Sequence, residues 1–156
     1  MAAKDDCPCR SGRPYKACCE PFHRGVREAP DPESLMRSRF AAFAKKEIVY
    51  LWRTLHADHE DRARGEAEVL RALKASAGTY RYAGLSILDR RDADESGVAK
   101  VLFLARLFEA NVERSFVECS DFKHDGNGWR YVSGVLKSVR SIKGDPAALT
   151  IDTFPT

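Results

Sequence analysis

The chain has 156 residues, of which 44% are hydrophobic and 31% are charged, and its formal net charge at pH 7 is +3. This composition is typical of a globular domain, and a chain of this length buries about 68–70% of its unfolded surface. It excludes a membrane-spanning protein, because no apolar run approaches the ~20 residues that a span requires. The N-terminal stretch with Lys4, Asp5 and Asp6 has no apolar core of a secretory signal. We therefore expect a cytoplasmic protein, whose thiols stay reduced.

The charge does not favour nucleic acid as a partner. A net charge of +3 is too weak to indicate it. Residues 1–28 carry six basic and four acidic residues, a net +2, and one zinc ion with four thiolates would add −2. Nucleic-acid binding is accordingly an unlikely function for this chain.

The chain's main chemical feature is a cluster of cysteines near its start. Four of the five cysteines form a C-x-C pair and a C-C pair, separated by eight residues, at Cys7, Cys9, Cys18 and Cys19. So short a segment buries too little apolar surface to fold alone, and zinc takes four such ligands tetrahedrally. We predict a zinc ion held by these four cysteines, with His23 as an alternative ligand. All four positions would be filled by protein, so the metal would be structural.

Three other interpretations of the cysteines remain open. Two disulfides would need an oxidising compartment. A thioredoxin-like redox site would have a C-x-x-C motif beside a βαβ unit, and the sequence shows neither. The four thiols could also be free, although four so close together favour a metal.

The cysteine run resembles a known motif. The pattern C-P-C-x-S-G-x-x-Y-x-x-C-C over residues 7–19 is similar to the SEC-C motif, a small zinc knuckle. That motif usually ends in Cys-His, whereas this run ends in Cys18-Cys19. The resemblance implies that the fourth ligand is a thiolate here.

The next part of the chain predicts helices. Two prolines make residues 28–32 a linker, after which Asp31 is a good N-cap and Pro32 suits the first helical position. We expect helices from Pro32 through Phe43, from residue 48 to near residues 56–59, and from about 65 to 77. Residues 60–64 are expected to form a loop, and Gly78 to stop the third helix.

From residue 80 the hydrophobic period changes from 3.6 to 2, which predicts strands. The expected strands cover residues 80–88, 97–109, 112–123 and 129–133, and residues 135–142 either add a fifth or continue the fourth. Residues 125–128, Asp-Gly-Asn-Gly, form a hairpin turn. The strand over 97–109 is hydrophobic on both faces, which indicates cover on both sides or a homodimer through the sheet. The tail from Gly144 is expected to be loosely held.

Helices followed by antiparallel strands predict an α+β fold. The order resembles the nuclear transport factor 2-like fold, a cone in which helices pack on a curved antiparallel sheet and the concave side holds a pocket. More specifically, P-E-x-L-M-R-S-R-F-x-A-F over residues 32–43, E-x-S-x-F over 118–122 and G-W-x-Y over 128–131 resemble the YchJ-like family. That resemblance implies a SEC-C knuckle joined to a nuclear transport factor 2-like domain, and it assigns no activity. The implied division is a knuckle over 1–28, the α+β domain over 29–145 and a tail over 146–156.

Three groups of polar residues are candidates for a pocket. Arg39, with Arg37 nearby, would bind an anion or pair with acids on the surface. His56, near Asp58 and His59, would be an acid–base group or merely end a helix. Glu118, predicted on the same strand face as Phe116, Ser120 and Phe122, would be a base or part of a cross-strand ion pair.

No phosphate-binding loop, catalytic triad or metalloprotease helix is present in the sequence, so an enzyme is not favoured. The first functional hypothesis is a protein-recognition role for the zinc knuckle on a nuclear transport factor 2-like scaffold. The alternatives are small-ligand binding or catalysis in the cone pocket, with Arg39, His56 and Glu118 as candidates, and weak nucleic-acid binding.

Overall fold

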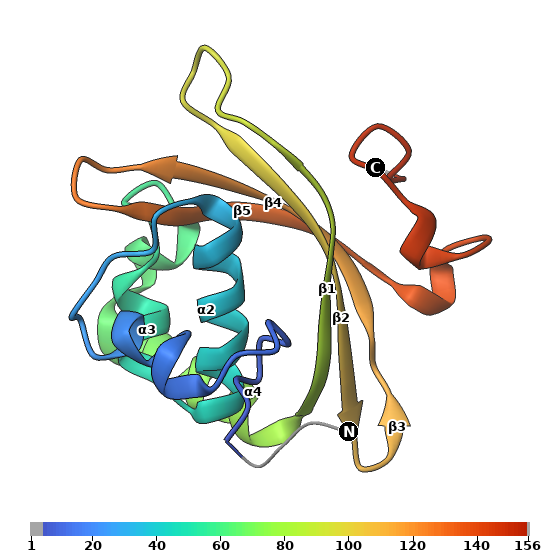
Figure 1. The fold of residues 1–156 in the computed structure, drawn as a ribbon, viewed down its shortest axis with the longest axis horizontal. Helices are drawn as coiled ribbons and strands as arrows, with labels where there is room; N and C mark the ends of the chain where they lie inside the picture. Colours follow the sequence, from blue (N-terminus) through green and yellow to red (C-terminus); the bar gives the residue numbers. More distant parts are fainter. Residues whose placement is uncertain (1–4, 156) are drawn as a thin grey trace.

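The computed structural model describes residues 5–155 and confirms an α+β fold (Figure 1). Helices lie on the concave side of one curved antiparallel sheet, and the N-terminal segment lies beside the helices. The first four residues of the predicted knuckle segment and the last residue of the predicted tail are outside the described residues. No described helix is long and apolar enough to cross a membrane.

The three predicted helices occur in the predicted order, but the second ends at Arg53, before its predicted end, and the short helix over residues 20–23 was not predicted. Their bounds are α1 Glu20–His23, α2 Pro32–Lys45, α3 Ile48–Arg53 and α4 Glu66–Thr79. Asp31 is the N-cap of α2, because its carboxylate accepts a 2.7 Å hydrogen bond from the backbone N–H of Ser34. The helix ends at Lys46, which adopts a left-handed conformation with φ +60°.

Two further predictions about the helices were wrong. Residues 60–64, expected as a loop, form a short 3-10 helix, Glu60–Arg64, whose N-cap His59 accepts a hydrogen bond from the N–H of Asp61. Gly78, expected to stop the third helix, lies inside α4 without a positive φ. Helix α4 continues to Thr79. The next residue, Tyr80, already has extended backbone and leads directly into the first strand, so no glycine turn ends the helix.

The sheet has the strand order β1-β2-β4-β5, all antiparallel, with the short β3 paired to β2. The strands are β1 Arg81–Arg91, β2 Ala99–Glu109, β3 Val112–Glu113, β4 Phe116–His124 and β5 Trp129–Ser138. The strand predicted over 112–123 is therefore two, divided at the buried Ser115, whose hydroxyl accepts from the N–H of Leu107. Residues after Gly134 continue β5 and then form the 3-10 turn Val139–Ser141.

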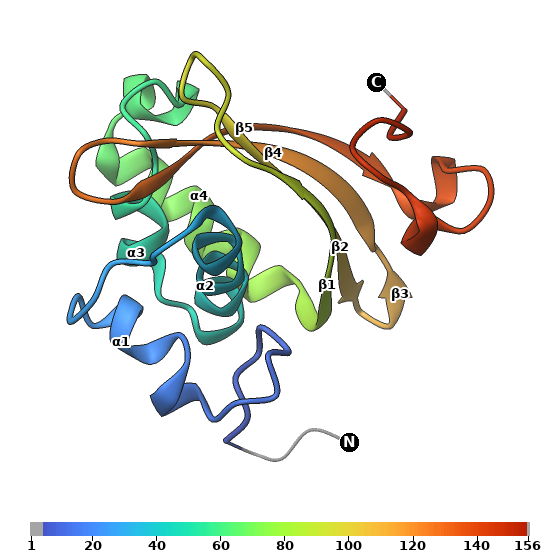
Figure 2. The same cartoon turned by 45° about the horizontal axis from the view of Figure 1, so that its top comes forward.

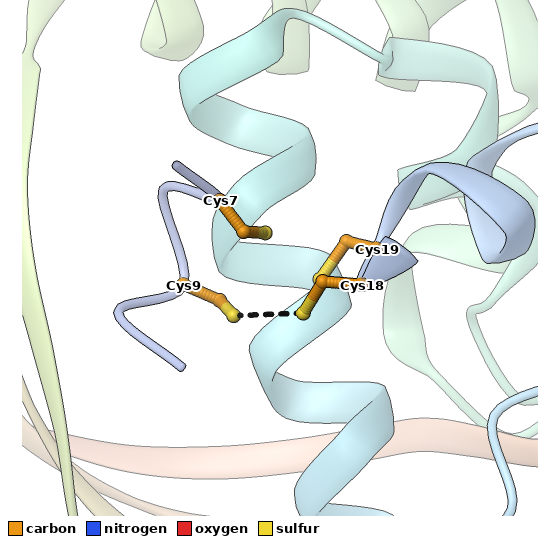
Figure 3. A group of neighbouring side chains, drawn as sticks. All are labelled: Cys7, Cys9, Cys18 and Cys19. Carbon is orange, nitrogen blue, oxygen red and sulfur yellow. Dashed lines mark hydrogen bonds between the residues drawn. The ribbon is translucent and has the colours of Figure 1, made fainter. Parts of the chain in front are cut away.

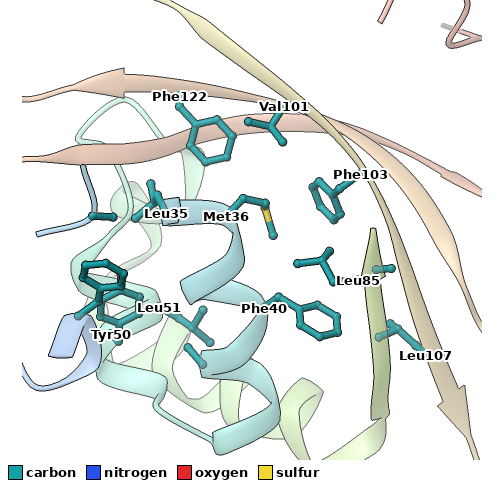
Figure 4. Packing of buried hydrophobic residues seen from close by; sticks show 14 residues of the cluster. Leu35, Met36, Phe40, Tyr50, Leu51, Leu85, Val101, Phe103, Leu107 and Phe122 are labelled. Atoms are coloured by element: carbon teal, nitrogen blue, oxygen red, sulfur yellow. The ribbon is translucent and has the colours of Figure 1, made fainter. Parts of the chain in front are cut away.

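The main core lies between α2 and the concave face of the sheet (Figures 2 and 4). Leu35, Met36 and Phe40 from α2 pack against residues of the sheet such as Phe103 and Phe122. The spacing of Met36 and Phe40 at i and i+4 places both side chains on one helical face. Helix α2 is thus the central helix of the fold.

The tail is not loosely held, contrary to the sequence-based expectation. Phe154 is only 5% exposed and packs on the convex face of the sheet with Leu102, Leu104 and Val117. The N–H of Ile151 also donates to the carboxylate of Asp89 at 2.8 Å. Sequence analysis expected a cover on both faces of this strand but did not identify the tail as the cover of the second face. Part of that face is therefore covered by the chain itself, and a homodimer through the sheet stays a prediction.

Candidate functional site

The cysteine segment is a tight hairpin that folds back on itself. Asp6 and Pro14 form an antiparallel bridge, and the N–H of Cys7 donates to the carbonyl of Arg13 at 2.9 Å. The turn between them needs two left-handed residues, Arg10 with φ +65° and Gly12 with φ +85°. This geometry returns the C-x-C pair to the C-C pair that follows the hairpin.

The four cysteine sulfurs meet at one buried point beside α2 (Figure 3). All four Sγ atoms lie within 4.8 Å of one another. The Sγ atoms of Cys9 and Cys18 are 3.5 Å apart, and those of Cys18 and Cys19 are 3.9 Å apart. A disulfide would require about 2.05 Å, whereas four thiolates on a tetrahedral metal at about 2.3 Å lie about 3.8 Å apart. The cluster therefore fits a single metal ion, and the described cysteines are free thiols.

The electrostatics of the cluster also favour a cation. The pKa of the Cys9 thiol is lowered, chiefly by hydrogen bonds with the Cys19 and Cys7 thiols. The pKa of Cys19 is raised by its hydrogen bonds with Cys7 and Cys9 and then by burial. One thiolate can thus be stabilised by its neighbours, but four buried thiolates repel one another. Deprotonating all four requires a positive ion among them.

The hairpin is fastened to α2 by side chains that sequence analysis had considered for other roles. The Nη1 atom of Arg37 donates to the carbonyl of Cys9 at 2.7 Å, and its Nε donates to Glu33 at 3.2 Å. The side chain of Ala41 is fully buried against the cysteines. Arg37 consequently joins the two segments and is not placed to bind an anion in the cone.

His23, the predicted alternative ligand, is engaged elsewhere. Its Nε2 lies 2.8 Å from the carbonyl of Ser38 and therefore donates, which leaves Nδ1 to accept from the Tyr15 hydroxyl at 2.6 Å. Burial lowers the pKa of His23, so the ring is held neutral. The group of possible metal ligands within residues 5–155 contains the four cysteines and not His23.

A cavity lies against another face of α2. It has a volume of about 640 Å³ and opens between α2, α4 and the concave face of the sheet. On the side of α2 the cavity is lined by Met36, Arg39, Phe40 and Phe43. Much of its remaining wall is aromatic, contributed by Tyr80, Tyr82, Phe103, Phe116 and Tyr131. The cone is therefore hollow, as the fold resemblance implied.

Arg39 is the buried cation of this cavity. The residue is 6% exposed, and its Nη1 donates to the carbonyl of Leu51 at 2.8 Å and to Oγ1 of Thr54 at 2.6 Å. Its guanidinium carbon lies 4.8 Å from the centre of the Tyr131 ring, a cation–π contact. Burial lowers the pKa of Arg39, but an arginine stays charged. Two helices and a strand thus fix a charged group at the cavity wall.

Glu118 lies on β4 beside this arginine's aromatic partner. Its Oε2 accepts a hydrogen bond from Tyr131 at 2.7 Å and another from Ser120. Burial, followed by the charge of Glu118, raises the pKa of Tyr131, so the hydroxyl stays protonated and donates. Gly134 makes room for the carboxylate, because a Cβ at that position would collide with Oε2 of Glu118. The prediction that Glu118 shares a strand face with Phe116, Ser120 and Phe122 agrees with its place in the cavity.

The histidine of the cavity is His59, not His56. His56 does not line the cavity; its Nδ1 accepts from the N–H of Asp58 and lies 3.5 Å from the carboxylate of that residue. His59 lines the cavity, its ring centre is 5.3 Å from that of Tyr131, and burial lowers its pKa. Two histidines three residues apart cannot be ranked from sequence alone, since the turn between them decides which one points inward.

Sequence analysis thus identified Arg39 and Glu118 and missed the groups that connect them. Tyr131 is the last residue of the G-W-x-Y motif, and its pairing opposite Phe122 places it on the face of Glu118. Thr54, which directly follows α3, accepts a hydrogen bond from Arg39 and helps to hold it. The structure brings these four residues together into one group, which we call the polar corner, with His59 beside it.

Comparisons with known proteins agree with both features. The family model of the middle nuclear transport factor 2-like domain of YchJ matches residues 31–134, and that of the SEC-C motif matches residues 4–21. The protein YchJ of Shigella dysenteriae is 34% identical over 128 residues, which are 82% of this chain and 81% of that protein.

Two solved structures share the fold. The solution structure of a SEC-C motif containing protein from Rhodopseudomonas palustris has a TM-score of 0.71 at 30% identity, covering 83% of this chain and 96% of that one. The crystal structure of a SEC-C motif containing protein from Psychrobacter arcticus has a TM-score of 0.68 at 24% identity, covering 81% of this chain and 80% of that one. With a SEC-C motif, a nuclear transport factor 2-like domain and these relatives, the chain belongs to the YchJ family.

Proposed function

We propose that this protein binds a small molecule in the cavity of its nuclear transport factor 2-like domain. The observation that carries the proposal is a cavity of about 640 Å³ with a buried arginine in its wall. Small-molecule sites typically measure about 300–1,000 Å³, are mostly apolar and hold a few fixed polar groups. The aromatic wall supplies the apolar surface, and the polar corner supplies the fixed groups.

Binding is favoured over catalysis by how the polar groups are used. The Nδ1 atom of His59 accepts from the N–H of Asp61 at 3.0 Å, so that nitrogen serves the backbone. The hydroxyls of Ser120 and Tyr131 both donate to Glu118. These bonds hold the polar corner in place, which suits orientation of a ligand.

Two variants of one strand test this proposal. Leu136 is 53% exposed and lines the cavity, whereas its neighbour Val135 is 46% exposed on the opposite face of β5. Leu136→Trp should block entry of an uncharged aromatic probe such as 1-naphthylmethanol, and Val135→Trp should not. Equal binding of the probe by both variants in calorimetry would refute a ligand site in the cone.

We also propose that the ion in the cysteine cluster is zinc. The four buried sulfurs, their spacing and the SEC-C match support it. With every ligand position taken by protein, the ion would act as a clamp that closes the hairpin. Metal analysis of purified protein should give one zinc per chain, and Cys18→Ser should lose it. Protein without stoichiometric metal would contradict the proposal.

The recognition role of the zinc knuckle and the cytoplasmic location stay predictions. Pull-downs from lysate with the intact protein and with Cys18→Ser would test the recognition role. Identical sets of captured proteins would count against it. Thiols found reduced in the cell would support the cytoplasmic location.

A further inference from the structure

The groups that Arg39 leaves without a partner indicate what the cavity accepts. A guanidinium has five N–H donors on three nitrogens. Of the three guanidinium nitrogens of Arg39, only Nη1 has hydrogen-bond partners among residues 5–155. These partners are the carbonyl of Leu51 and the hydroxyl of Thr54. The one side-chain nitrogen or oxygen of the described residues that is both sealed from solvent and unbonded is Nε of Arg62. The Nε and Nη2 atoms of Arg39 are therefore not sealed in protein, and the residue lines the cavity.

The arginine is also held rigidly in this orientation. Oγ1 of Thr54 donates to the carbonyl of Tyr50 at 2.8 Å, so its lone pairs remain to accept from Arg39. The ring of Tyr131 covers one face of the guanidinium. A cation–π contact uses the flat face of a guanidinium and leaves its N–H edge free for a second, planar partner.

No acid of the described residues neutralises Arg39 directly. Both of its hydrogen bonds go to neutral oxygens, and none of the described carboxylates lies within 4.0 Å of its nitrogens. Glu118 and Asp61 are near enough to interact with its charge, but the Oε2 atom of Glu118 is occupied by the hydroxyls of Ser120 and Tyr131, and the carboxylate of Asp61 pairs with Arg64. The carboxylate of Glu118 is thus stabilised by two donors, whereas the charge of Arg39 has no anionic partner. A buried cation of this kind is costly until an anion joins it.

The walls define the remainder of the ligand. Phe40 packs edge-on against Tyr82 at 5.8 Å, and Phe43 stacks on Tyr82 at 5.6 Å. On the sheet side, Phe103 and Phe116 meet edge to face at 6.1 Å. These rings present apolar faces and edges that suit a flat hydrocarbon body. The exposed rim carries both signs of charge, from Glu113, Arg114 and Arg140, so the choice of a charged ligand depends on the buried Arg39.

We propose that the ligand of the cone is an aromatic carboxylate whose anionic group binds the free N–H edge of Arg39. This inference rests on the proposed function, because it names the chemical class that the same cavity takes. The carboxylate would form a bidentate, charge-assisted pair with Nε and Nη2. The ring system would lie against the aromatic wall.

Three probes with one hydrocarbon body test the inference by isothermal calorimetry. They are 1-naphthoate, 1-naphthylmethanol and 1-naphthylmethylamine, which carry an anionic, a neutral and a cationic group. The carboxylate should bind about 10- to 100-fold more tightly than the alcohol, the range that hydrogen bonds to a charged group supply. Alcohol or amine binding as tight as the carboxylate would overturn the inference while leaving a ligand site in place. No binding by any of the three would refute the proposed function as well.

Variants assign the preference to the arginine. Arg39→Gln should remove the preference for the carboxylate and leave alcohol binding within about threefold, an effect below that of one hydrogen bond. Arg90→Gln is the matched control, because Arg90 pairs with Glu33 outside the cavity and the substitution removes the same charge. A preference that survives Arg39→Gln would overturn the inference. The comparison of the three probes on the unmodified protein decides the matter even where Arg39→Gln does not fold.

Discussion

Removing the metal should open the cysteine hairpin and leave the rest of the protein folded. The perturbation is Cys9→Ala, which deletes one ligand. The hairpin has no apolar core of its own beyond the cysteines and Tyr15, so its order depends on the ion. The body has a separate core that includes Leu35, Phe40 and Phe122, and this core does not involve the sulfurs.

The loss of stability follows from the contacts that join the two parts. Three partly or fully buried hydrogen bonds connect residues 5–23 to the helices. They link Arg37 to Cys9, His23 to Ser38 and Arg53 to Phe22. At about 0.5–1.5 kcal/mol each, they contribute about 2–4 kcal/mol to the body. The unfolding free energy of the body should therefore fall by about that amount and remain positive.

Urea unfolding followed by the fluorescence of Trp52 and Trp129 measures the body, and hydrogen exchange measures the hairpin. We expect Cys9→Ala to raise exchange over residues 5–20 by orders of magnitude while strand amides stay protected. Cys119→Ala is the control, because Cys119 is the fifth cysteine and lies outside the cluster. Unchanged exchange in the hairpin of Cys9→Ala would refute a metal clamp. Complete loss of the cooperative transition would refute the independence of the body.

Three further changes test other parts of the structure. Gly134→Ala should displace the carboxylate of Glu118 and cost about 1–3 kcal/mol, measured by urea unfolding; an unchanged midpoint would contradict the close approach. Phe154→Ala should cost about 3 kcal/mol and speed proteolysis of the tail, whereas a truly loose tail would show neither effect. The pKa of His59 is lowered by burial, so the folded protein binds fewer protons there than the unfolded chain and loses stability as pH falls below about 6.5. Protonation would also break the bond from Asp61, so His59→Gln should lose less stability than the unmodified protein between pH 7 and 5; parallel losses would contradict this.

The parts of the fold that follow from local chemistry could be predicted from the sequence. Asp31 and Pro32 start a helix because the carboxylate caps the backbone and proline needs no N–H donor at that position. The alternation along residues 116–122 correctly placed Glu118 on the inner face, because side chains of a strand alternate. The cysteine cluster could also be predicted, because four cysteines within thirteen residues are close enough in sequence to meet in space.

The parts that depend on distant contacts could not be predicted. Gly78 is of the residue type that commonly ends a helix, but here α4 continues to Thr79 and the chain then enters the sheet. The tail has turn-like composition, and its order comes from Phe154 meeting the convex face of the sheet. His59 was ranked below His56 because the short 3-10 helix that orients it has no strong sequence signal. In each case tertiary packing overrode the local propensity.

An NMR titration of the labelled protein with 1-naphthoate tests the central claim most directly, because it locates the ligand as well as detecting it. We predict saturable amide shifts that concentrate at cavity residues such as Ala105, Leu107 and Tyr131, with a shift of the Arg39 side-chain Nε–H signal. Shifts scattered over the surface, or none at the cavity, would contradict a ligand site inside the cone.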